Sequence, residues 1–146
     1  MAKMDGFALA DRVDLVIREA TAADGEAIRS LQSPGAVLWD VNMYPCLIAI
    51  CQNRVAAFLF WREVDPGERE ILYLATQPAF RRKGIAVALV RRFLTNCPGA
   101  VFLEVRESNH AARKLYQLAG FQEVGRREAY YESPPETAIV MKFHSC

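Results

Sequence analysis

Short apolar runs alternate along this chain with stretches in which apolar residues recur every three or four positions. The runs predict β-strands, because their apolar residues are continuous or alternate with polar ones. Strands are expected at residues 15–18, 46–51, 55–64, 69–76, 100–106, 121–128 and 136–143. Helical spacing predicts helices at residues 21–32, 86–96 and 109–119, while residues 36–44 fit either a loop or a short helix. This order predicts a mixed α/β domain with an antiparallel part.

A basic loop separates the strand at 69–76 from the helix at 86–96. Its sequence is Arg81-Arg82-Lys83-Gly84-Ile85-Ala86. The first turn of a helix carries unpaired N–H groups, and a glycine lets the backbone approach a ligand, so the loop suits a phosphate group. Neither the P-loop signature nor the dinucleotide signature occurs in the chain. The same residues also fit an ordinary basic turn at the surface, and the sequence alone leaves both interpretations open.

Composition narrows the class of protein further. The 146 residues suit one domain, and 52% hydrophobic with 24% charged residues is typical of a globular chain. We expect an N-terminal extension over residues 1–13 and one domain over residues 14–146. A net charge of +1 disfavours nucleic acid as a partner. No apolar run reaches the ~20 residues that span a bilayer, and no signal peptide is visible, so no membrane contact and a cytoplasmic location are expected.

Cysteine and histidine give no pattern of their own. The four cysteines contain no C-x-x-C pair, and only two histidines could join them. We therefore expect neither a metal site nor a disulfide framework. Cys46 and Cys51 fall in an apolar strand and are predicted to be core thiols.

Two residues are candidates for acid–base chemistry. Glu104 is a carboxylate in an otherwise apolar strand, where it shares a face with Phe102 and Arg106. It could accept a proton from an amine, or it could be an exposed residue paired with Arg106. Tyr116 lies twelve positions further on, in the next predicted helix, and could donate a proton or simply pack.

The combined motifs resemble a known family, the GNAT acetyltransferases. The loop fits the family's Arg/Gln-x-x-Gly-x-Gly/Ala pattern. The segments Leu103-Glu104-Val105-Arg106, Ser108-Asn109, Leu115-Tyr116 and Gly120-Phe121, followed by Arg126-Arg127 and Tyr130-Tyr131, resemble the RimI-type branch, the ribosomal-protein-alanine N-acetyltransferases. The resemblance covers residues 15–143 and is densest at residues 72–131.

This resemblance implies an acyl-CoA N-acyltransferase fold, with a mixed, mostly antiparallel sheet flanked by helices. It implies acetyl-CoA as cosubstrate without a metal, Glu104 as proton acceptor and Tyr116 as proton donor. The cofactor-binding residues it implies are Leu74, Ala75, Thr76, Arg81, Arg82, Lys83, Gly84, Ile85, Ala86, Val87 and Asn109. It also implies a loop in which Tyr130 and Tyr131 bind the N-terminus of a protein or peptide, such as a ribosomal protein.

The acceptor half departs from the branch. The segment after the first helix, residues 35–44, is short and has only Trp39 and Tyr44 as aromatic residues, and Thr137 stands where an acidic residue is common. A small-molecule amine therefore stays an alternative acceptor. A non-catalytic acetyl-CoA-binding module is a second alternative, and either a monomer or a homodimer is compatible with the sequence. Tyr130 and Tyr131 could also merely cover the sheet edge.

Overall fold

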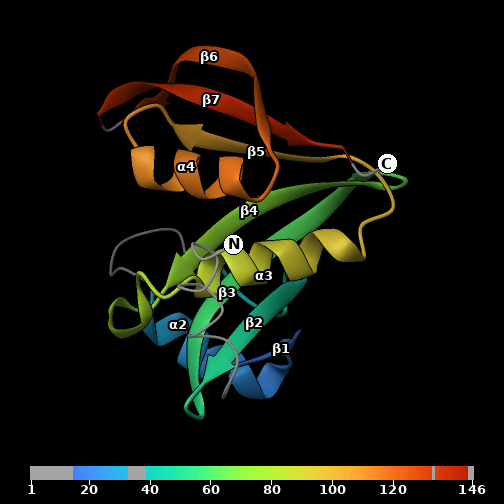
Figure 1. Ribbon diagram of the computed structural model, residues 1–146, viewed down its shortest axis with the longest axis vertical. Helices are drawn as coiled ribbons and strands as arrows, with labels where there is room; N and C mark the ends of the chain where they lie inside the picture. The colour runs from blue at the N-terminus through green and yellow to red at the C-terminus, as the bar shows by residue number, and fades with distance from the viewer. Residues whose placement is uncertain (1–14, 33–38, 133, 145–146) are drawn as a thin grey trace, which may run out of the picture.

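The computed structural model describes residues 15–32, 39–132 and 134–144, which form one mixed sheet with helices on both faces (Figure 1). The predicted domain boundary at residues 13 and 14 lies outside these residues. The sheet order is β1-β2-β3-β4-β5-β7-β6. The strands are β1 (Val16–Glu19), β2 (Cys46–Cys51), β3 (Arg54–Asp65), β4 (Glu68–Thr76), β5 (Val101–Arg106), β6 (Gln122–Glu132) and β7 (Pro135–Phe143). The fold class predicted from the sequence is confirmed.

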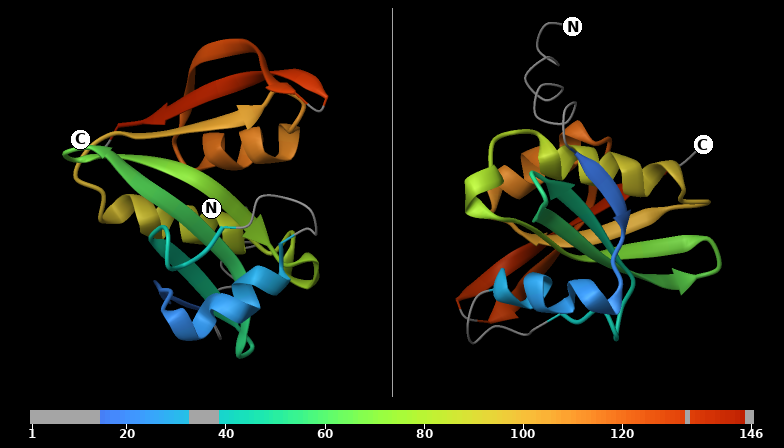
Figure 2. Two further views of the ribbon diagram at one scale, coloured as in Figure 1. Left: turned by 180° about the vertical axis from the view of Figure 1, so that it is seen from behind. Right: turned by 90° about the horizontal axis from the view of Figure 1, so that it is seen from below.

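Helices cover the two faces unequally. The α-helices are α2 (Gly25–Ser30), α3 (Ile85–Thr95) and α4 (His110–Leu118), and the 3₁₀ turns are η2 (Ala22–Asp24) and η3 (Pro78–Phe80). Figure 2 shows α3 and α4 on one face of the sheet and α2 on the opposite face. Two buried clusters result, since the central strands present apolar side chains to both sides. Within the described residues, no helix has the length and apolar character needed to cross a bilayer.

The helix ends follow their local sequence. Asn109 is the N-cap of α4, and its side-chain oxygen accepts a hydrogen bond from the Ala112 N–H at 3.1 Å. Gly120 follows the helix with a φ of 106°, a conformation that glycine adopts without strain. A Cβ there would lie 3.2 Å from the Phe143 ring, so the position is also tightly packed.

Most predicted ends agree with the structure to within a residue, but three segments differ more clearly. The helix expected at 21–32 is a 3₁₀ turn followed by six helical residues that end at Ser30. Of the ambiguous segment, residues 36–38 lie outside the described residues, and residues 39–44 contain a turn rather than a helix. β6 continues four residues beyond the predicted end and pairs Tyr131 with Glu136. The segment predicted to be a tyrosine loop is therefore the end of a strand, because Tyr131 and Glu132 pair with residues of β7.

The sheet divides between β4 and β5. These are its only parallel neighbours among the described strands, and they pair only through Arg69 with Val101 and Glu70 with Phe102. Beyond Glu70 the two strands diverge, as Figure 1 shows. β4 stays with β3 over its whole length, whereas β5 continues beside β7. One edge of β4 therefore lacks a partner strand from Ile71 to Thr76, and the candidate site lies at this division.

Candidate active site

A cavity of about 630 Å³ opens at the end of β4, where the loop leads into α3. One wall comes from β4 and the basic loop, and the other from the first two turns of α4. Ten of the cofactor-binding residues expected from the sequence line this cavity: Leu74, Ala75, Thr76, Arg81, Arg82, Gly84, Ile85, Ala86, Val87 and Asn109. Lys83 is exposed in the same loop but does not line the cavity. The fold thus gathers residues from three separate segments around one space.

The loop backbone fits an anionic group. Arg82 and Gly84 both have positive φ, 64° and 77°, and Gly84 is the N-cap of α3. Left-handed residues in a loop turn N–H groups into a concave surface that binds anions. The next N–H groups belong to the first turn of α3, where the positive end of the helix dipole adds to the effect. Arg81 donates a hydrogen bond from Nε to the Thr76 carbonyl at 3.3 Å, which ties the loop to the end of β4.

A smaller cavity of about 250 Å³ continues between the diverging strands β4 and β5. Glu104, Tyr116 and Tyr131 line it. It shares with the larger cavity the lining residues Tyr73, Leu74, Asn109 and Ala112. The two acid–base candidates therefore face a space that adjoins the loop cavity.

Tyr116 is positioned by packing. Its side chain is 6% exposed, and its ring makes an edge contact with Phe121 at 5.4 Å between centroids. Burial raises the pKa of the Tyr116 hydroxyl, since the phenolate would lose hydration. The phenol therefore keeps its proton at neutral pH, as a proton donor requires.

Glu104 is held by a charged partner from another strand. Its carboxylate is 18% exposed and lies 2.9 Å from Nε of Arg127 on β6. The alternative pairing with Arg106 is wrong, because Arg106 pairs instead with Glu136 at 3.2 Å. Glu104 also lines a third cavity of about 190 Å³, together with Glu70 and Arg127. Arg127 was not among the candidate residues, because cross-strand register, rather than sequence spacing, brings it to Glu104.

The two tyrosines of β6 lie beside this carboxylate. Their rings meet edge to face at 5.2 Å, and Tyr130 is 46% exposed. The neighbouring Glu104 carboxylate raises the pKa of the Tyr130 hydroxyl. Burial, followed by the charge of Glu104, raises the pKa of Tyr131. Tyr131 lines the smaller cavity and Tyr130 lies outside it, so the pair spans its rim.

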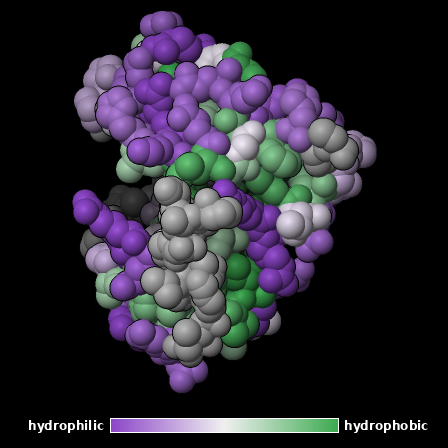
Figure 3. Space-filling model, viewed as in Figure 1, coloured by the Kyte–Doolittle hydropathy of each residue, from purple (hydrophilic) through white to green (hydrophobic). Residues whose placement is uncertain are grey.

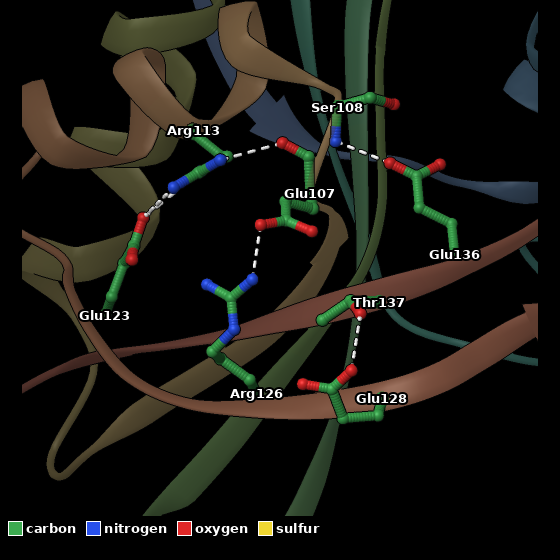
Figure 4. Close-up of polar contacts among 8 residues, drawn as sticks. All are labelled: Glu107, Ser108, Arg113, Glu123, Arg126, Glu128, Glu136 and Thr137. Carbon is green, nitrogen blue, oxygen red and sulfur yellow. Dashed lines mark hydrogen bonds and ion pairs between the residues drawn. The ribbon is translucent and has the colours of Figure 1, made fainter.

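Figure 4 shows polar contacts around the turn that follows β5. Glu136 accepts a hydrogen bond from the Ser108 N–H at 2.5 Å, and Ser108 and then Arg106 lower the pKa of Glu136. Arg113 donates to Glu123 at 2.6 Å and to the Glu107 carbonyl at 2.7 Å. These contacts join the turn after β5 to both strands of the β6–β7 hairpin.

A sheet divided in this way, with a basic loop that leads into a helix beside the division, is the fold of the GNAT acetyltransferases. The family model for the acetyltransferase (GNAT) family matches residues 17–121, and the chain belongs to this family. Over 78 residues it is 40% identical to N-alpha-acetyltransferase RimI of Mycobacterium tuberculosis, covering 53% of this chain and 49% of that protein. The chain thus spans about half the length of that relative.

Two further matches cover a larger share of the similar protein. A [ribosomal protein bS18]-alanine N-acetyltransferase of Haemophilus ducreyi is 34% identical over 100 residues, covering 64% of this chain and 68% of that protein. The crystal structure of the ribosomal-protein-S18-alanine N-acetyltransferase of Escherichia coli superposes with a TM-score of 0.78 at 26% identity. The superposition covers 89% of this chain and 93% of the Escherichia coli protein. The resemblance inferred from the sequence is thereby confirmed at the level of family and branch.

Proposed function

We propose that the protein is an acetyl-CoA-dependent N-acetyltransferase that modifies a primary amine, specifically the α-amine of a protein or peptide N-terminus. One observation carries the proposal: the loop cavity and the Glu104–Tyr116 cavity share part of their lining. A phosphate-bearing group at the loop would therefore direct its far end toward the acid–base residues.

The loop cavity fits acetyl-CoA in its chemistry. Its anion-binding loop suits the pyrophosphate, with Arg81, Arg82 and Lys83 supplying positive charge. The unpartnered edge of β4, including Leu74 and Thr76, offers backbone groups for the amides of the pantetheine arm. When bound, acetyl-CoA supplies an acetyl group on a thioester. Asn109 has its side-chain oxygen engaged as a helix cap, which leaves its amide NH₂ as the group that could contact the cofactor.

The acid–base residues have complementary tasks in this proposal. Glu104 accepts the proton that the acceptor amine gives up, and Tyr116 provides a proton to the leaving thiolate. Alignment of the two substrates contributes as well, since a ternary complex removes much of the entropic cost. A general base typically contributes about 10²–10⁴-fold in rate.

An α-amine is the acceptor we favour. Its pKa is near ~8, against ~10.4 for lysine, so a carboxylate deprotonates it more readily at neutral pH. The relatives of the RimI branch are named for modifying an alanine of a ribosomal protein. A ribosomal protein is accordingly the first acceptor to test, with Tyr130 and Tyr131 binding its N-terminal residues.

A panel of acceptors tests the proposal through release of the free CoA thiol. It contains peptides with free N-termini, an N-terminally blocked lysine peptide and a polyamine. We expect the free N-terminal peptides to react fastest. Tyr130→Ala or Tyr131→Ala should raise the KM for the peptide more than the KM for acetyl-CoA. Val124→Ala, which changes another exposed residue of the same strand, should change neither.

Three outcomes would redirect the proposal. A faster reaction with the polyamine would favour a small-molecule amine acceptor, which the carboxylates Glu70 and Glu104 in the third cavity could attract. A faster reaction with the lysine peptide would reject the α-amine preference. Acetyl-CoA binding without CoA release from any amine would favour a non-catalytic binding module.

A further inference from the structure

The two tyrosines at the rim each carry an arginine on the ring face, but the arginines are held differently. Arg106 lies over Tyr131 at 4.3 Å and donates from Nη1 to Glu136 and to the Pro134 carbonyl, each at 3.2 Å. Arg127 lies over Tyr130 at 5.3 Å and has Glu104 as its ion-pair partner at 2.9 Å. Among the described residues, Arg127 has no second acceptor. Arg106 is therefore fixed, and Arg127 is held by one carboxylate.

We infer that the Arg127 guanidinium occupies, before an acceptor binds, the position at Glu104 that the ammonium of the acceptor takes during the reaction. Acceptor binding is then an exchange of one cation for another, and Arg127 sets the acceptor affinity. This inference rests on the proposed function, because it assumes that Glu104 receives the amine.

The surroundings of Glu104 form a site for a cation. A carboxylate and the face of an aromatic ring both bind ammonium and guanidinium groups in proteins. Both are engaged by the Arg127 side chain, which is itself 58% exposed. The occupant cannot give up a proton to Glu104, because arginine stays protonated in proteins. A reactive amine must consequently displace it from the carboxylate.

The strand permits this displacement. The ladder between β6 and β7 is irregular between Arg127 and Tyr131, and Ala129 in this stretch has a φ of 52°. Arg127 also lines the third cavity beside Glu70, whose own ion-pair partner is Arg62 at 2.8 Å. Because the Arg127 side chain is exposed and Glu70 lines the same cavity, the guanidinium can withdraw toward solvent and Glu70 by side-chain rotation alone.

A kinetic comparison tests the exchange with the peptide that reacts best in the panel. In Arg127→Gln the KM for the peptide should fall about two- to fivefold, the range expected when a partly exposed ion pair no longer competes. The value of kcat and the KM for acetyl-CoA should stay near wild type. Arg126→Gln is the matched control, since Arg126 is the neighbouring residue and pairs with Glu107 away from the cavities. An unchanged or raised peptide KM in Arg127→Gln, or a fall in kcat, would overturn the inference.

A second measurement does not depend on turnover. Methylguanidinium, a free copy of the arginine head group, is titrated into Arg127→Gly while the tyrosine ring signals are followed by NMR. Tyr130→Phe, in the same background, assigns the signal of Tyr130. We expect a saturable shift of that signal in Arg127→Gly but not in wild type or Arg126→Gly.

The absence of a saturable shift in Arg127→Gly would refute the cation site. If the shift appears while no amine supports CoA release, the cation site stands and the proposed catalytic function fails. The two failures are therefore distinguishable.

Discussion

The edge strand β6 and the strands on the other side of the β4–β5 division are stabilised by different means. In the N-terminal region, β2, β3 and α3 bury large apolar side chains completely, among them Phe58, Leu59 and Leu89. In the C-terminal region, β5 and β7 also bury Val101, Ile139 and Met141 completely. The strand β6, in contrast, is exposed along almost its whole length, and ion pairs connect it to β5 and α4. Figure 3 shows hydrophilic residues over this hairpin. The loop proposed to bind acetyl-CoA thus rests on a packed core, whereas the exposed side chains of β6 lie where substitution costs the fold little.

The largest effect we expect tests whether the C-terminal region supplies the acid–base groups of the reaction. Glu104→Gln keeps the size of the side chain but cannot accept a proton, so kcat should fall by about 10²–10⁴-fold. Tyr116→Phe should also lower kcat, because it removes the hydroxyl and keeps the ring packing. Calorimetry should give a near wild-type Kd for acetyl-CoA in both variants. Full turnover in both would reject the assigned roles.

The next effect concerns stability and tests the comparison directly. Leu59→Ala in the N-terminal region should lower the free energy of unfolding by about 2–5 kcal/mol, since it leaves a cavity in a fully buried site. Arg126→Ala in the C-terminal region should leave the free energy of unfolding close to wild type, because its ion pair with Glu107 is exposed to solvent. Chemical denaturation measures both values. Equal losses would show that the hairpin is as important to stability as the core.

A pair of glycines separates cofactor binding from backbone strain. Gly84 and Gly67 have similar positive φ, 77° and 81°, so alanine strains the backbone at both positions. Only Gly84 lines the loop cavity. Gly84→Ala should weaken acetyl-CoA binding about tenfold, the effect of losing one hydrogen bond to a charged group. Gly67→Ala should leave the Kd unchanged in the same calorimetric titration. Equal affinity in the two variants would mean that the loop is only a surface turn.

The smallest effect is a pH dependence in the C-terminal region. Contacts with Ser108 and Arg106 lower the pKa of Glu136 from its ordinary 4.5. A carboxylate with a lowered pKa stabilises the fold above the ordinary value, and this contribution disappears as the pH falls through the lowered one. Glu136→Gln should thus be less stable than wild type at neutral pH, and the two proteins should converge in acid. A difference in Tm that stays constant from neutral pH into acid would contradict the assignment.

Local patterns in the sequence predicted much of this architecture. Apolar periodicity located β2 and α3 to within a residue. Most of the apolar side chains in both elements are buried, so the apolar pattern ends close to where the element ends. The end of β6 was missed because its residues are exposed and polar, so pairing with β7 rather than burial keeps them in a strand. The partner of Glu104 was also missed, because Arg127 reaches it across strands whose register the sequence does not encode locally.

The early end of pairing between β4 and β5 has a consequence for hydrogen exchange. Because the ladder stops at Glu70, the amides of residues 71–76 that face the division have no partner strand and should exchange quickly in the free protein. A ligand chain lying along β4 would protect these amides while leaving those shared with β3 as slow as before. Hydrogen exchange at the division therefore reports on ligand binding, because each amide whose exchange slows shows how far along β4 the ligand extends.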